Sequence, residues 1–287
     1  MRGAKSHELA LEGECVTRNK MLRFTKMNGA GNDFVLIDNR AGEVKLTPQQ
    51  VARICDRHRG VGADGILLLE PAANGADFRM RYYNRDGGEA EMCGNGARCF
   101  ARFAERRANV GDRVSFETVA GVIVAEMEGE LVRLTMSEPR DARFNIDLST
   151  DDRTWHGHFI NTGVPHVVVP VPALDKVDVE QEGAAIRHQA LFAPAGTNAN
   201  FLEKRGAREI AIRTYERGVE EETLACGTGV VASAIVFAAI ENVTGPIAVS
   251  VRGGNTLKVD FERNGDRFSQ VTLTGPAEFV FEGTIEI

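Results

Sequence analysis

Short apolar runs bounded by turn residues occur along nearly the whole chain and predict a protein built mainly of β-strands. Runs of this length, rich in Val, Ile, Phe and Tyr and separated by Gly-containing turns, are typical of strands. A first strand is expected to begin at Met21, and a helix is predicted near 178–190. The other predicted strands are 34–38, 66–70, 78–83, 114–119, 122–127, 131–136, 159–163, 166–171, 198–203, 209–215, 247–251, 255–261 and 271–275.

The order of these predicted elements occurs twice along the chain. The stretches "CGNGARCF" (93–100) and "CGTGVVAS" (226–233) each begin with Cys-Gly-x-Gly and lead into a helix-like segment. The interval between their cysteines nearly equals that between Pro139 and Pro276, which are expected to end the last strand of each half. Matched order at near-equal spacing predicts an internal duplication.

The two helix-like segments differ in polarity. Residues 228–240 carry no charge, and a helix that is apolar all round is a buried one. The first helix, with Arg98, Arg102, Glu105 and Arg106, is expected to be amphipathic. The predicted fold class is α+β, with two pseudo-symmetric α/β domains. Each is a curved, mostly antiparallel sheet wrapped around a central helix, and the active site lies in the cleft between them.

Length and composition fit an ordinary globular protein of two domains, since the chain has 287 residues and is 43% hydrophobic. The predicted domains cover 21–138 and 139–276. Residues 1–20 lack the apolar core of a signal peptide. They are expected to form a disordered extension or to result from a misassigned start.

Charge, apolar run length and cysteine content argue against nucleic-acid binding, membrane crossing and a disulfide-bonded secreted fold. The net charge is −7 with both signs interspersed, so no nucleic-acid partner is expected. The longest uncharged apolar run, 227–240, is too short to cross a membrane. Five irregularly spaced cysteines without a secretion signal predict no disulfide framework and a cytoplasmic protein.

Cys93 and Cys226 each precede a helix start, where free backbone N–H groups and glycines favour an anion. A thiol there is expected to ionise more easily, with its pKa lowered from ~8.5 to roughly 3.5–7.5. Single cysteines near helices are more often inert core residues. The other three, Cys15, Cys55 and Cys99, are assigned to packing.

Three kinds of chemistry would use such a thiol pair. Zinc binding needs nearby ligands in patterns such as C-x-x-C, which neither thiol has, so no metal is expected. A dithiol redox switch lacks the same motif but remains possible. In the third, two thiols face each other across a cleft, one removing a proton and the other supplying one to the opposite face, which inverts a carbon centre.

From about 22 to 287 the sequence resembles the diaminopimelate epimerase family. The motifs that carry the resemblance are "KMNGAGNDFVLID" (26–38), "RHRGVGADGILL" (57–68), "YNRDGGEAEMCGNGARCFARF" (83–103), "NTGVPHVVV" (161–169) and "TYERGVEEETLACGTG" (214–229). The resemblance implies a homodimeric isomerase without pyridoxal phosphate or any other cofactor. It would interconvert LL- and meso-2,6-diaminopimelate on the route to lysine and peptidoglycan. It also implies that a last strand, near 277–287, returns to the first domain.

The same resemblance implies roles for individual residues. Cys93 and Cys226 match the base and acid, and His166 and Glu216 match residues that support the chemistry. Glu216 would bind the α-ammonium and Arg217 a carboxylate. The implied substrate-binding residues are Asn32, Asn84, Gly94, Asn95, Asn198, Glu216, Arg217, Gly227 and Thr228.

The chain departs from the family pattern at a few positions. Val164 stands where many relatives have Asn, Asn28 where His is common, and Gly65 where some carry Gln. "YERGVEEET" is one residue longer than the usual form. These differences leave open another two-cysteine racemase, acting on histidine or a proline derivative, and a redox switch or zinc module remains as an alternative of another class.

Overall fold

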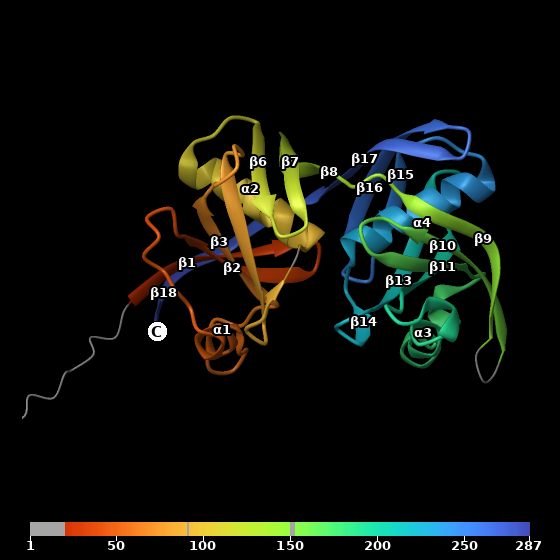
Figure 1. Ribbon diagram of the computed structural model, residues 1–287, viewed down its shortest axis with the longest axis horizontal. Coiled ribbons are helices and arrows are strands. Elements are labelled where there is room, and N and C mark those ends of the chain that lie inside the picture. The colour runs from red at the N-terminus through yellow and green to blue at the C-terminus, as the bar shows by residue number, and fades with distance from the viewer. Residues whose placement is uncertain (1–20, 91, 150–152) are drawn as a thin grey trace, which may run out of the picture.

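The structure is a computed structural model that describes residues 21–90, 92–149 and 153–287. Its fold is mixed α/β and mostly strand, with two lobes side by side formed by the first half of the chain (red to yellow in Figure 1) and the second half (green to blue). The expectation for residues 1–20, including Cys15, lies outside the described residues. No helix in the described ranges is long and apolar enough to cross a bilayer.

Four α-helices and two short 3-10 turns lie within the described residues. They are α1 (Pro48–Cys55), α2 (Gly94–Ala108), α3 (Val179–Arg187), α4 (Gly227–Glu241), η1 (Leu174–Lys176) and η2 (Ala190–Phe192). The strands of the first half and its returning strand are β1 (Met21–Gly29), β2 (Asn32–Asp38), β3 (Gly65–Pro71), β4 (Phe78–Asn84), β5 (Glu89–Ala90), β6 (Arg113–Thr118), β7 (Gly121–Glu128), β8 (Leu131–Thr135) and β18 (Glu278–Glu286). Those of the second half are β9 (Arg140–Ser149), β10 (Thr154–Asn161), β11 (Pro165–Pro170), β12 (Asn198–Lys204), β13 (Glu209–Glu216), β14 (Glu221–Thr223), β15 (Ile247–Ser250), β16 (Thr256–Asn264) and β17 (Arg267–Pro276).

The two halves repeat one pairing pattern. The first runs β18-β1-β2-β3-β4-β6-β7-β8, and the second runs β9-β10-β11-β12-β13-β15-β16-β17. In both series only the third and fifth pairings are parallel, and all others are antiparallel. Antiparallel pairing of β8 with β17 joins the two series. The duplication predicted from the sequence therefore appears in the strand topology.

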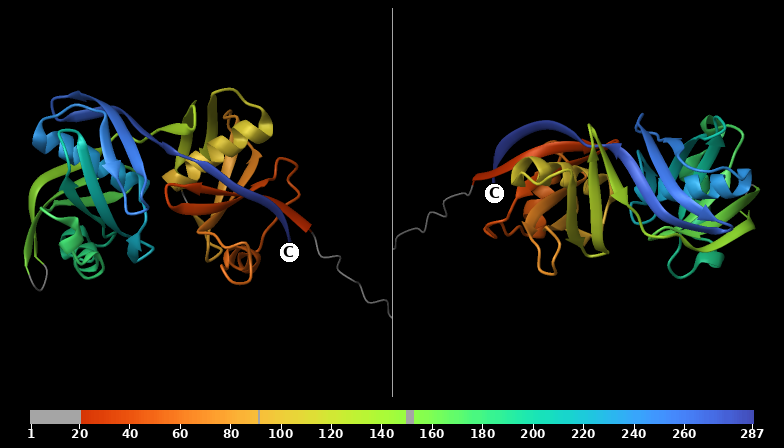
Figure 2. Two further views of the ribbon diagram at one scale, coloured as in Figure 1. Left: turned by 180° about the vertical axis from the view of Figure 1, so that it is seen from behind. Right: turned by 90° about the horizontal axis from the view of Figure 1, so that it is seen from above.

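The last strand links the lobes, as the resemblance implied. Figure 2 shows the chain passing from β17 in the second lobe to β18, which lies along β1 in the first. Pro276 ends β17 as expected. The same expectation was wrong for Pro139, because β8 ends at Thr135 and residues 136–139 form the crossing between the lobes.

Each lobe holds one long helix against its sheet. Helices α2 and α4 are both 15 residues long, and each ends at an Asn in the left-handed conformation, Asn109 and Asn242. Helix α4 is buried along nearly its whole length, as its apolar sequence predicted. In α2, however, Arg98 does not lie on a solvent-facing side as an amphipathic helix would require, because its side chain is fully buried.

The largest apolar core continues from one lobe into the other. It contains residues of α2 and α4, such as Phe100 and Val231, together with Leu273 of the joining strand β17. A smaller apolar core lies on the outer side of each sheet. The one in the first half is built around α1 and the one in the second half around α3. The two helix N-termini are therefore held at a junction built by both halves.

Candidate active site

The N-termini of α2 and α4 meet at the junction of the lobes. Cys93 and Cys226 are the residues that precede the two helices, both in extended conformation. A Cβ built on Gly94 would lie 3.6 Å from Gly227 Cα, and one built on Gly227 would lie 3.4 Å from Gly94 Cα. The two glycine backbones are thus in contact, which brings both helix dipoles and both thiols to one place.

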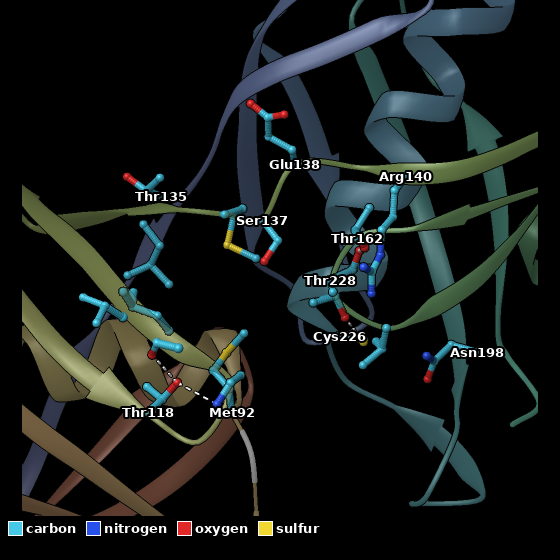
Figure 3. A pocket seen from close by; sticks show the side chains of 18 of the residues that line it. Met92, Thr118, Thr135, Ser137, Glu138, Arg140, Thr162, Asn198, Cys226 and Thr228 are labelled. Carbon is cyan, nitrogen blue, oxygen red and sulfur yellow. Dashed lines mark hydrogen bonds between the residues drawn. The ribbon is translucent and has the colours of Figure 1, made fainter.

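Both thiols line a single cavity of about 620 Å³ between the lobes. An adjoining cavity of about 590 Å³ shares Met92, Glu216, Arg217, Cys226 and Thr228 with it. Figure 3 shows this second cavity, with Met92 and Thr118 on one side and Thr162, Asn198, Cys226 and Thr228 on the other. The predicted residues that line one or both cavities are Asn32, Asn84, Cys93, Gly94, Asn198, Glu216, Arg217, Cys226, Gly227 and Thr228.

Two predicted residues, Asn95 and His166, lie behind the cavity wall rather than on it. Both are fully buried. The Asn95 amide donates to Asn32 Oδ1 at 2.6 Å and to the carbonyl of Ala225 at 3.1 Å, so it ties the two lobes together beside the thiols. Asn32 in turn donates to Asp64 Oδ2 at 2.9 Å.

His166 reaches Cys226 through a hydroxyl. Its Nε2 lies 2.9 Å from Thr228 Oγ1, which lies 3.5 Å from Cys226 Sγ. The amide of Asn200 donates to Val167 O at 2.8 Å and to His166 Nδ1 at 3.2 Å. Since Nδ1 then accepts, the proton of a neutral imidazole sits on Nε2, and Thr228 can donate to the sulfur.

Burial keeps this imidazole neutral. It lowers the pKa of His166 to about 3, with the nearby Arg217 charge acting in the same direction. His166 therefore acts as a fixed hydrogen-bond donor at neutral pH and not as a proton-exchanging base.

The pKa values of the two thiols shift in the direction opposite to the one expected from the sequence. The helix starts were expected to lower their pKa values, but burial raises the pKa of Cys93 to about 11 and that of Cys226 further. The N–H groups of Gly96 and Asn95 do lower the pKa of Cys93, and the N–H of Gly229 that of Cys226. Desolvation outweighs these donors, because a thiolate loses more hydration than a thiol on burial.

Glu216 adds to the same effect from the second lobe. Its negative charge raises the pKa of both thiols. Burial also raises the pKa of Glu216 itself, against a 2.8 Å hydrogen bond from Thr223 that lowers it. An uncompensated carboxylate beside the two thiols is suited to receive a cation.

Arg217 and Asn198 are held as a unit at the second cavity. Asn198 Oδ1 accepts from the backbone N–H of Arg217 at 2.8 Å, and its amide donates to Pro165 O at 2.9 Å. The Arg217 guanidinium has a backbone partner, Ala195 O at 3.2 Å, and its pocket-facing position leaves other donors for an anion.

Two further residues, Asp64 and Tyr82, also line the cavity with the thiols and were not predicted from the sequence. Asp64 holds Asn32 and accepts from Arg57 at 2.8 Å, and its place in the motif at 57–68 was the available signal. Of the four departures from the family pattern, Val164 lines the second cavity and the longer stretch at 215–223 lines the cavity with the thiols, whereas Asn28 and Gly65 line neither. Gly65 lies in β3, where an added Cβ would lie 2.5 Å from Tyr83 O and 2.6 Å from the Tyr82 ring.

Two observations concern the alternatives of a zinc module and a redox switch. Across residues 21–90, 92–149 and 153–287, no group of three or more His, Cys, Asp or Glu side chains could hold a metal ion. In the same ranges the cysteines, including Cys93 and Cys226, are free thiols.

Comparison with solved structures defines the class of fold. A hydroxyproline epimerase from Agrobacterium vitis is similar with a TM-score of 0.71 and 16% identity, over 93% of each chain. A Bacillus anthracis phenazine biosynthesis protein of the PhzF family is similar with a TM-score of 0.69 and 19% identity, over 93% of this chain and all of that one. At such identities the likeness shows the fold alone, a mixed α/β fold shared by epimerases and PhzF proteins.

Sequence comparison then defines the family. The diaminopimelate epimerase family model matches residues 24–140 and 158–280. Diaminopimelate epimerase of Chlorobaculum tepidum is 45% identical over 91% of this chain and 100% of its own length, and that of Aquifex aeolicus is 44% identical over 92% and 98%. The chain belongs to the diaminopimelate epimerase family, which confirms the resemblance carried by its five motifs.

Proposed function

We propose that this protein is a cofactor-independent isomerase that interconverts LL- and meso-2,6-diaminopimelate in lysine and peptidoglycan-precursor biosynthesis. The observation that carries the proposal is the meeting of two Cys-preceded helix N-termini in one cavity, in a chain that is 45% identical over 91% of its length to a diaminopimelate epimerase. An inversion at carbon needs one proton acceptor and one donor on opposite faces, and a matched thiol pair supplies both.

In this mechanism one cysteine is a thiolate and the other a thiol. The thiolate sulfur takes the Cα proton, and the electron pair left on Cα takes the proton of the opposite S–H. The enzyme is left with the two roles exchanged. The negative charge that develops on Cα and its carboxylate faces the N–H groups of the two helix starts, which are preorganised to stabilise it.

Glu216 couples substrate binding to thiol ionisation. Its charge raises the pKa of both thiols when it is unpaired. An α-ammonium bound beside Glu216 would neutralise that charge and lower the pKa of both. Ionisation of one thiol is thereby favoured when the substrate is present, in agreement with the general need for a poised catalytic pKa.

The distal end of the substrate carries a second ammonium and a second carboxylate. Asn32, Asn84, Asn198 and Arg217 line the cavities and offer both donors and acceptors for these groups. Val164 lies in the second cavity where many family members have Asn, and this one difference favours a second candidate, a related two-cysteine racemase for another amino acid.

The proposed function includes a domain organisation, an oligomeric state and a cellular compartment. The domains are 21–138 with the strand at 277–287, and 139–276, and the active site is the cleft between these pseudo-symmetric units. The enzyme works as a homodimer in the cytoplasm. Light scattering on the purified protein tests the dimer, and a mass near 31.3 kDa would speak for a monomer.

Activity assays separate the two candidates. LL-diaminopimelate, proline, 4-hydroxyproline and histidine are each supplied, and inversion is followed by chiral chromatography. We expect turnover of diaminopimelate alone, and loss of it in both Cys93→Ala and Cys226→Ala. Preferred turnover of a monoamino acid would support the alternative substrate class.

A further inference from the structure

Arg98 is the largest fully buried side chain of the molecule's described part, and its guanidinium has no carboxylate partner there. It donates to Asn95 Oδ1 at 2.8 Å and to three backbone carbonyls, those of Pro276 at 3.2 Å, Gly29 at 3.4 Å and Gly94 at 3.5 Å. Burying a charge is costly unless an opposite charge compensates it. The ionisable groups that act on this guanidinium are two thiols, Cys99 and Cys93.

The surrounding backbone leaves room for this cation at the junction of the lobes. A Cβ built on Gly275 of β17 would lie 3.1 Å from Arg98 Nε and would clash with Leu257 Cδ2. Through Asn95 and Gly94 O, the guanidinium holds the first turn of α2, whose Asn95 and Gly96 N–H groups face the Cys93 sulfur. Arg98 therefore stands directly behind the anion-binding end of the helix.

Among the residues that the structure describes, Cys93 has such a cation and Cys226 does not. Cys99, the other thiol that acts on Arg98, is fully buried in the core, whereas Cys93 is partly exposed in the cavity. In α4 the position equivalent to Arg98, five residues after the cysteine, is the apolar and fully buried Val231. Cys226 instead has the neutral Thr228–His166 pair. The internal duplication has thus diverged at the position behind each thiol.

We propose that Arg98 is a positioning residue whose buried charge is the fixed counter-ion of the Cys93 thiolate, so that Cys93, and not Cys226, is the thiol that ionises when substrate binds. This inference rests on the proposed function only for the role of the two sulfurs as base and acid. The other ionisable groups that face Cys93 are Glu216 of β13, Tyr82 of β4 and Cys226, which are neutral or negative and cannot replace the cation.

Alkylation of Cys93 tests the proposal without an activity assay. In a Cys226→Ala background, the rate of carbamidomethylation of Cys93 by iodoacetamide is measured from pH 6 to 11 by mass spectrometry. With Arg98→Met we expect the rising part of this profile to move to higher pH by about one unit, because the Arg98 charge lowers the pKa of Cys93. At a fixed pH below the midpoint, alkylation slows about tenfold.

Arg98→Lys separates charge from hydrogen bonding, and Arg102→Met is the matched control. Lys keeps the charge but loses the planar set of donors, so it should restore most of the shift. Arg102 is on the same helix but bonds Glu105 and the carbonyls of Gly129 and Leu131, so its loss should leave the profile unchanged.

An unshifted profile in Arg98→Met, or a shift in Arg98→Lys as large as in Arg98→Met, would overturn the counter-ion role. If Arg98→Met does not fold, Arg98→Lys alone decides, since its alkylation profile should stay close to that of the wild type. Epimerisation by Cys93→Ala would refute the proposed function separately, because the alkylation profile does not depend on turnover.

Discussion

At the scale of single residues, His166 is a buried imidazole that contacts the candidate site through one hydroxyl. Its imidazole is fully buried, donates toward Thr228, and is held from the other side by Asn200. Sequence resemblance pointed to His166 as a supporting residue, and the structure adds the hydroxyl through which it reaches Cys226. That link involves residues 62 positions apart in sequence, so no local pattern could reveal it.

The low pKa of His166 makes a prediction about stability. The folded imidazole titrates at about 3, whereas the unfolded one titrates near 6.5. As pH falls below about 6.5 the unfolded chain takes up a proton that the folded protein does not. The contribution of this residue to the free energy of unfolding is thus present above pH 6.5 and decreases by about 1.4 kcal/mol per pH unit toward pH 3.

The contribution of His166 to the free energy of unfolding is measured by urea unfolding of the wild type and of His166→Gln from pH 7.5 to 4. The variant is expected to be less stable at neutral pH, and the difference should shrink as pH falls. A difference in unfolding free energy that is constant over the whole range would show that His166 is protonated in the folded protein.

Val164 is a single-residue departure from the family pattern that lies in a cavity. It shares that cavity with Asn198 and Arg217. Val164→Asn should restore one polar contact to the substrate, and a neutral hydrogen bond contributes about 0.5–1.5 kcal/mol. We expect KM for LL-diaminopimelate to fall by up to about tenfold with kcat retained. Loss of turnover in a folded variant would mean that this pocket binds its substrate differently.

At the scale of elements, most strand positions were predictable, whereas β5, β9, β14 and α1 were not. The buried strands match the apolar runs, but β9 reads "RDARFNIDLS" and nearly all of its side chains are exposed, so no apolar pattern marked it. Helix α1 has only 8 residues; its capping box of Thr47 with Gln50 and Pro48 at its start was a usable signal that hydrophobic periodicity alone did not capture. The position of Arg98 inside the protein also escaped prediction, because its partners come from segments far apart in sequence.

The contact between β1 and α2 depends on a glycine. A Cβ built on Gly29 would lie 2.6 Å from Asn95 O and 3.0 Å from Cys99 Sγ, in a part of the core that cannot yield easily. Gly29→Ala should therefore lower the free energy of unfolding by about 1–3 kcal/mol. The matched control is Gly111→Ala, where a Cβ meets nothing within 4 Å and the change should stay within about 0.5 kcal/mol. Equal stability of the two variants in urea would argue against the packing described at this contact.

At the scale of the whole molecule, the duplication places equivalent ends of two helices against each other. The sequence predicted this relation from two short motifs, and the pairing pattern of both halves agrees with it. The shared core was not predictable, because hydrophobic patterns show which residues are buried but not which half buries them.

Contact of the two helix starts also predicts sensitivity to oxidation. Gly94 and Gly227 touch, and each follows its cysteine directly, so a small movement of the lobes can bring the Cα atoms within the roughly 7 Å that a disulfide requires. We expect an oxidant to abolish activity and a reductant to restore it. Peptide mapping should find Cys93 linked to Cys226 and Cys55 still free. Inactivated enzyme with both active-site thiols free would contradict this.

The central claim is that the two sulfurs lie on opposite faces of one carbon. Turnover of LL-diaminopimelate in deuterated water tests it most directly, with isotope content of substrate and product followed by mass spectrometry from the first turnovers. We predict that the meso product carries one deuterium at the inverted centre while recovered substrate stays largely unlabelled, and that Cys93→Ala and Cys226→Ala each exchange the Cα proton of a different configuration. Product without deuterium in the first turnovers, or exchange of the same configuration by both variants, would contradict the account.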